Sequence, residues 1–123
     1  MIRAGLLAAV IAFPAMAEEV GDAPGGVVRL LDRLTGQLED IDLSRGQSAT
    51  HERLTVQLDD CRYPLADPAS NAYAHLTIMD AMTPGAPVFA GWMVASSPAL
   101  NALDHPRYDV WILRCDTPTR DGE

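Results

Sequence analysis

The sequence predicts an all-β fold: a small antiparallel sandwich or barrel of about six strands with one short helical turn. Apolar runs of strand length recur between turn residues, and no window carries a long helical stripe. The chain has 123 residues, of which 48% are hydrophobic. That length suits one domain, and that composition is sufficient for a core.

Residues 1–17 are typical of a secretory signal peptide. Arg3 gives a basic start, an apolar run follows, and small residues stand at Ala15 and Ala17. We therefore expect cleavage after Ala17 and export to the periplasm.

A membrane anchor is the alternative interpretation of the same segment. An anchor needs about 20 apolar residues to cross the hydrocarbon layer. This run is interrupted by Pro14 and ends at Glu18. We expect a soluble mature protein with no direct membrane insertion.

The mature chain is acidic, with eight Arg and no Lys against seventeen Asp and Glu, a formal charge of −9. Phosphate backbones and anionic lipid head groups would repel such a surface, which excludes nucleic acid as a partner. The absence of lysine also excludes lysine nucleophiles.

The mature chain divides into an arm, one domain and a tail. Residues 18–26 are acidic, rich in Gly and Pro and aperiodic, which predicts a flexible N-terminal arm. Residues 27–118 form the expected single all-β domain. Residues 119–123 form a loose C-terminal tail.

Six segments have strand length and turn residues at their ends. They are 27–34, 37–43, 54–61, 72–79, 88–94 and 108–115. Alternation in the third and fourth segments predicts half-buried strands, whereas 88–94 and 108–113 are apolar on both faces and predict central strands. Turns at Thr35-Gly36 and at 44–46 predict a meander of the first strands.

A short helical turn is expected between the last two strands. Ser97 is a plausible N-cap, Pro98 suits a first helical position, and 99–103 can form one or two turns before Pro106.

Cys61 and Cys115 are the chain's two cysteines, and an even number in an exported chain predicts a disulfide. Closing so long a loop stabilises a fold by about 4 kcal/mol on the chain-entropy estimate. A redox or metal pair is the alternative, but no Cys-x-x-Cys motif is present.

A hydrolase would use Ser96 or Ser97 as nucleophile, His105 as base, and Asp104 or Asp109 to orient that base. No Gly-x-Ser-x-Gly motif supports this interpretation. We therefore predict no catalytic residue, and keep a small cell-envelope hydrolase as the alternative function.

Metal binding is a further interpretation of the histidines and the acidic groups. His51, His75 and His105 could join Asp80 or Asp104 around zinc, but they lie in separate segments without short ligand spacing. The acidic groups 39–42 and 59–60 lack the layout of a calcium loop. A glycosidase carboxylate pair stays an open alternative. We expect no metal and no cofactor.

The two tryptophans allow two interpretations. An exposed indole can anchor a sugar or a protein interface. Trp92 and Trp111 lie in segments that read as central strands, so we expect them to be at least partly core.

The segment 89–111 reads FAGWMVASSPALNALDHPRYDVW, and the earlier segment 31–36 reads LDRLTG. Both resemble a family of small exported alphaproteobacterial proteins of unknown function. The resemblance covers most of the mature chain. It implies an accessory role on the periplasmic side of the respiratory NADH:quinone oxidoreductase.

We therefore expect a non-catalytic accessory protein that binds a periplasmic or inner-membrane protein. The connection between the last two strands is the expected binding segment, because surface loops carry function and this one is apolar. The expected partner-binding residues are Ser96, Ser97, Leu100, Leu103, His105 and Tyr108.

Overall fold

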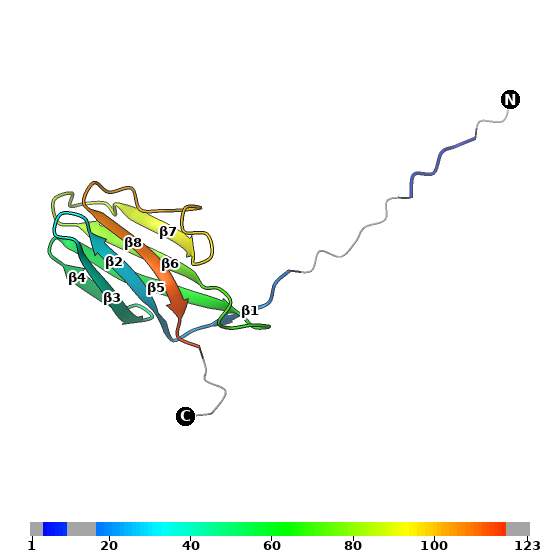
Figure 1. The fold of residues 1–123 in the computed structure, drawn as a ribbon. Coiled ribbons are helices and arrows are strands. Elements are labelled where there is room, and N and C mark those ends of the chain that lie inside the picture. The colour runs from blue at the N-terminus through cyan, green and yellow to red at the C-terminus, as the bar shows by residue number, and fades with distance from the viewer. Residues whose placement is uncertain (1–3, 10–16, 118–123) are drawn as a thin grey trace.

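Two antiparallel sheets form a sandwich in the computed structural model of the protein, which describes residues 4–9 and 17–117 (Figure 1). Its strands are β1 (Val20–Asp22), β2 (Gly25–Asp32), β3 (Gln37–Ser44), β4 (Ser48–His51), β5 (Leu54–Pro64), β6 (Tyr73–Asp80), β7 (Phe89–Val94) and β8 (Tyr108–Cys115). The larger sheet has the order β1-β5-β6-β7, with β4 also on β5, and the smaller has the order β3-β2-β8. The predicted sandwich is confirmed, and the six expected strands are β2, β3 and β5 to β8.

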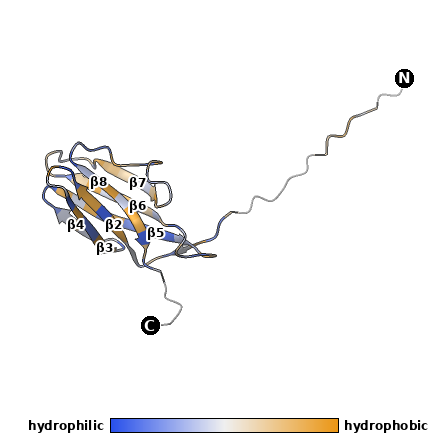
Figure 2. Ribbon diagram, in the orientation of Figure 1, coloured by the Kyte–Doolittle hydropathy of each residue, from blue (hydrophilic) through white to orange (hydrophobic). Residues whose placement is uncertain are grey.

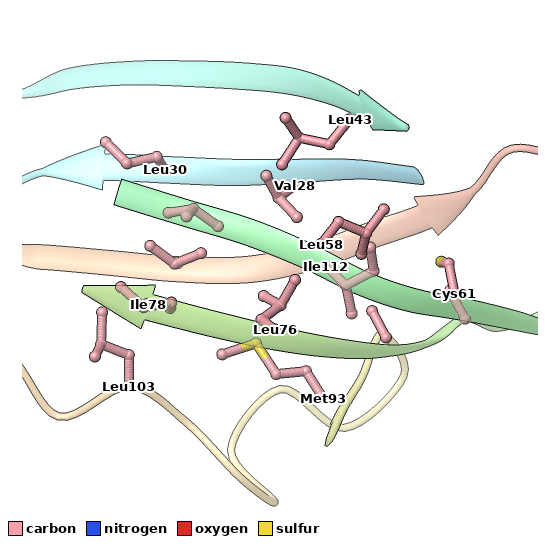
Figure 3. Packing of buried hydrophobic residues seen from close by; sticks show 14 of the residues in the cluster. Val28, Leu30, Leu43, Leu58, Cys61, Leu76, Ile78, Met93, Leu103 and Ile112 are labelled. Carbon is pink, nitrogen blue, oxygen red and sulfur yellow. The ribbon is translucent and has the colours of Figure 1, made fainter. Parts of the chain in front are cut away.

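The core lies between the two sheets. The larger sheet buries alternate residues of β5 and β6, and the smaller sheet adds the inward residues of β2 and β8. Figure 2 shows apolar and polar residues mixed along the strands, as one-sided burial requires. Figure 3 shows Leu58 of the larger sheet near Val28 and Ile112 of the smaller.

β7 and β8 are edge strands, so the expectation that they are central is wrong. β7 ends the larger sheet and β8 ends the smaller one. Their second apolar face belongs to the outside of the sandwich, where Trp92 is 40% exposed and Trp111 is half-buried. The outer aromatic residues, rather than a second covering layer, explain the continuous apolar pattern.

The expected helical turn at 97–103 is also corrected, because the described residues include no helix. The amide of Leu100 donates to the carbonyl of Ser97, which closes a single turn. The chain then extends from Ala102, because Asn101 donates from Nδ2 to the Trp92 carbonyl at 2.9 Å and Leu103 enters the core. These two contacts hold the segment against the domain without a helical turn.

The segment 18–26 is not a separate arm. Val20–Asp22 pairs with Arg62–Pro64, Ala23 is buried in the core, and β2 already begins at Gly25. The domain therefore begins before residue 27, because backbone pairing with β5 orders a segment that has little apolar content.

The predicted leader and tail are only partly covered by the structure. Residues 4–9 have no regular structure and are exposed, whereas residues 1–3, 10–16 and the predicted tail 119–123 lie outside the described residues. Among residues 4–9 and 17–117, no helix is long and apolar enough to cross a membrane.

A disulfide joins Cys61 of β5 to Cys115 of β8, as predicted, with their Cα atoms 5.7 Å apart. It links the larger sheet to the smaller one at the end of the sandwich near β1. Gly26 is required beside it, since an added Cβ would lie 2.9 Å from the Cys61 sulfur.

Candidate functional site

The connection, residues 95–107, runs from β7 to β8 and carries most of the predicted binding residues. Ser96, Ser97 and Leu100 are exposed on it. Leu103 is only 6% exposed and belongs to the core cluster, where Figure 3 shows it near Ile78. The predicted binding surface is therefore divided between an outer part and a buried part.

His105 and Tyr108, which the sequence also suggested as partner-binding residues, are buried as well, so their side chains do not form part of the outer surface. Tyr108 begins β8 and points into the sandwich, with no exposed surface. Sequence alone does not separate His105 from Leu100, because both lie in the same loop-like segment, whereas Tyr108 begins the last predicted strand. His105 and Tyr108 support the connection from beneath.

The first turn of the connection is fixed by hydrogen bonds to β7 and to the loop before β6. The amide of Ala95 donates to the Ala72 carbonyl at 2.9 Å, and the amide of Ser96 donates to Oδ1 of Asn71 at 3.0 Å. The amide of Ser97 donates to the Val94 carbonyl at 3.1 Å. The exposed residues therefore stand on an ordered base.

His105 fixes the other end of the connection. Its Nδ1 accepts hydrogen bonds from the amides of Arg107 at 3.0 Å and Tyr108 at 3.2 Å. Nδ1 must then be unprotonated, so the proton is on Nε2, which donates to Oδ2 of Asp80 at 2.7 Å. Both ring nitrogens are thus used within the fold.

The arrangement at His105 removes the support for a hydrolase in this segment. A general base needs a free ring nitrogen within hydrogen-bond reach of the nucleophile. Neither Ser96 nor Ser97 is a hydrogen-bond partner of His105 in the described chain, and Asp109 instead accepts from Arg33 at 3.0 Å. The predicted residues do not assemble a triad.

Asp80 is held as a carboxylate at the end of β6. The hydrogen bond from His105 lowers the pKa of Asp80 from its usual value. The amide of Met82 and the nearby charge of Arg53 act in the same direction, against the effect of burial. The structure thus unites one histidine and one carboxylate of the metal set considered from the sequence, but as a hydrogen-bonded pair.

A metal centre is not formed by these residues. In the described part of the chain, no group of three or more His, Cys, Asp or Glu side chains could hold a metal ion. His75 instead contacts Asp59 at 2.8 Å on the outer face of the larger sheet.

Asp32, at the end of β2, forms a second buried carboxylate site that sequence reasoning missed. It accepts from Nε and Nη2 of Arg107 at 3.0 and 2.9 Å and from the Leu34 amide at 3.0 Å. Nε2 of His51 lies 3.3 Å from Oδ2 of the same carboxylate, and Nδ1 of His51 lies 3.2 Å from Glu39. The sequence signal that could have indicated this site is an acidic residue, Asp32, inside the predicted strand 27–34.

Tyr108 lies between the two carboxylate sites. Cζ of Arg107 is 4.9 Å from the centre of its ring, and the rings of His105 and His51 are 5.1 and 6.1 Å away. The cluster therefore ties the start of β8 to β2, β4 and β6, and we assign it a structural role that positions the connection.

The buried carboxylate of Asp32 predicts a specific acid sensitivity. Hydrogen bonds from Arg107 hold the pKa of Asp32 far below its usual value, against the effect of burial, with help from the Leu34 amide and His51. An unfolded Asp titrates near pH 3.9, so Asp32 stabilises the fold above about pH 4, and this contribution is lost as the pH falls toward the folded pKa.

We expect Asp32→Asn to be less stable than the wild type at pH 7 and to lose less stability on acidification. Between about pH 4 and pH 2, wild-type unfolding should take up about one more proton than unfolding of the variant. Urea unfolding at a series of pH values measures this difference. Parallel pH profiles for the two proteins would contradict the assignment.

One shallow hollow lies beside the connection, and another lies on the outer face of the larger sheet. One, of about 300 Å³, lies between the connection and β8 and is lined by Pro98, Ala99, Ala102, Leu103, Asp109, Val110 and Trp111. The other, of about 340 Å³, lies on the outer face of the larger sheet and is lined by Glu18, Val20, Arg62, Tyr73 and Trp92. Each hollow contains one tryptophan.

Trp92 is on the outer face, where Arg62 and His75 contact its ring. Cζ of Arg62 lies 5.0 Å from its ring centre, and the ring of His75 meets it edge-on at 5.4 Å. Trp92 is thus more exposed than the sequence predicted, whereas half-buried Trp111 agrees with partial packing.

Comparison with known proteins places the fold in a bacterial family. Residues 26–115 match the family described as uncharacterized protein conserved in bacteria, DUF2155. The chain belongs to this family. The match extends from β2 to the end of β8, so the DUF2155 region contains the connection, both carboxylate sites and the disulfide.

A relative of this DUF2155 protein is found in Rickettsia prowazekii (strain Madrid E). It is the uncharacterized protein RP359, 28% identical over 92 residues, which cover 73% of this chain and 59% of the relative. The chain therefore spans about three fifths of the length of that relative. No solved structure matches the chain.

Proposed function

We propose that this DUF2155 protein is a non-catalytic accessory protein of the periplasm, which binds a periplasmic or inner-membrane protein through the outer side of the connection. The observation that carries the proposal is the exposed apolar surface there. Leu100 is 74% exposed, and the hollow beside β8 adds Pro98, Ala99 and Trp111. Exposed apolar groups on an ordered loop are typical of protein-binding sites.

The support beneath this surface favours binding. Leu103 and His105 are buried, and Asn101 is hydrogen-bonded to β7, so Leu100 is presented by an ordered segment. Little conformational entropy then remains to be lost when a partner binds. Ser96 and Ser97 would form a polar rim, as found around apolar interface centres.

The proposed compartment and the proposed partner are supported by different observations. A disulfide favours an oxidising compartment, in agreement with the predicted signal peptide. The resemblance of the sequence implies an association with the respiratory NADH:quinone oxidoreductase. The periplasmic side of that complex is therefore the first partner to test.

We expect Leu100→Asp to weaken partner binding by about tenfold or more, as for an apolar residue at an interface centre. The tagged mature protein is purified from gently solubilised membranes, and recovery of respiratory-complex subunits is quantified. Leu34→Asp is the matched control, because Leu34 is 75% exposed on the β2–β3 turn. Recovery of the wild type as a free species, with no protein enriched over an untagged control, would refute the proposal.

A further inference from the structure

The edges of the two sheets differ in how they are covered. β1 and β4 have only 3 and 4 residues, and β7 is lined by the connection through Asn101. The connection lies beside β8, with the hollow lined by Leu103, Val110 and Trp111 between them. Among the described strands, this leaves β3, with 8 residues, as the long edge without a cover.

The register of β3 shows which of its backbone groups are unpaired. The amide of Arg45 donates to the Pro24 carbonyl, so these two residues form a hydrogen-bonded pair at the start of the ladder. Hydrogen-bonded pairs alternate with non-hydrogen-bonded pairs in an antiparallel ladder. The residues of β3 whose backbone bonds to β2 are therefore Leu43, Ile41 and Glu39. The backbone N–H and C=O groups of Leu38, Asp40 and Asp42 therefore point away from β2. All three residues are exposed.

The side chains along this edge are acidic. Glu39, Asp40 and Asp42 follow one another in β3, and Figure 2 shows the strand in hydrophilic colours. Arg29 pairs with Asp40 at 2.7 Å, but Asp42 instead faces Asp116. Burial and the neighbouring Asp42 raise the pKa of Asp116, and the charge of Arg114 opposes this rise only in part.

We infer that the open edge of β3 binds an extended, basic segment of a partner polypeptide, which adds a fourth strand to the β3-β2-β8 sheet. The unpaired backbone groups of Leu38, Asp40 and Asp42 supply hydrogen bonds that an extended chain satisfies. The carboxylates select basic side chains at the facing positions. A second copy of this chain is disfavoured, because two acidic edges would oppose like charges.

This surface lies on β3, away from the connection, so its test is independent of the proposed function. The probe is an acetylated peptide of alternating arginine and valine, as long as β3. It is added to the ¹⁵N-labelled mature protein, and amide shifts and hydrogen exchange are followed by NMR. We expect shifts along β3 and at least about tenfold slower exchange at Leu38, Asp40 and Asp42.

Two controls separate strand pairing from simple charge attraction. The same peptide, N-methylated at alternate backbone nitrogens, retains its charge but cannot form the ladder, and it should give no protection. Leu38→Pro removes an amide that β2 does not use, so we expect at least about tenfold weaker binding, against less than about threefold for Leu38→Ala.

A further variant guards against misfolding of the proline variant. Asp42→Arg keeps the backbone amide and reverses one charge, so we expect severalfold weaker binding of the peptide with an unchanged spectrum elsewhere. Equal protection by the N-methylated peptide, shifts confined to other strands, or no shift at millimolar peptide would overturn the inference.

Discussion

Leu103→Asp is expected to destabilise the domain by roughly 4 kcal/mol, because it removes a core side chain and places an unpaired carboxylate among apolar residues. Leu103 is buried with Ile78, Met93 and Val110 in the core cluster. Urea unfolding followed by tryptophan fluorescence measures the loss.

Leu100→Asp is the matched control for this experiment. The same chemical change is made three positions earlier in the same connection, at a residue that faces solvent. We expect a stability change within about 0.5 kcal/mol there, as for other surface substitutions. Equal losses for the two variants would contradict the division of the connection into an exposed part and a buried part.

Removing the disulfide is expected to cost about 2–5 kcal/mol, the usual loss for a small disulfide-bonded domain. Cys61→Ala combined with Cys115→Ala frees β5 from β8 and leaves the two sheets joined by packing and chain connections. The midpoint of urea unfolding should fall, with the far-ultraviolet spectrum at low urea still that of a β protein.

Reduction of the wild type provides the control for the double variant. The reduced wild type should unfold at nearly the same urea concentration as the variant, because both lose the same cross-link. A variant as stable as the oxidised protein would show that the cross-link adds nothing to the fold.

The six main strands could be predicted because each of them carries its own apolar pattern. β1 and β4 could not, because neither Val20–Asp22 nor Ser48–His51 carries an alternating apolar pattern. They become strands by pairing with β5, which supplies backbone partners along both segments. Short strands of this kind are determined by their neighbours more than by their own residues.

The sequence also could not show whether a strand lies at the centre or at the edge of its sheet. The segments 88–94 and 108–113 are apolar on both faces, which is typical of a buried strand. In this fold one face holds the core and the other holds Trp92 or Trp111, half covered by Arg62 or by the connection. Large aromatic residues with a partly covered outer face give the same pattern as full burial.

The sequence placed the candidate binding residues on one connection, and the structure divides them into exposed and buried residues. Leu100 and Leu103 have similar sequence surroundings, and only the path of the chain past Asn101 separates an exposed side chain from a buried one. His105 and Asp80 are 25 positions apart, so their hydrogen bond depends on the sheet arrangement. Asp32 was missed for the same reason, because Arg107 reaches it from another strand end.

Site-specific photo-crosslinking at position 100 tests most directly whether the connection is the binding surface. A photoreactive amino acid replaces Leu100 in one variant and the equally exposed Leu34 in another, and both are irradiated in intact cells. We predict one discrete adduct from position 100, with the partner that is recovered by affinity purification, and little or none from position 34. Equal adducts from both positions, or none from position 100, would contradict docking through the connection.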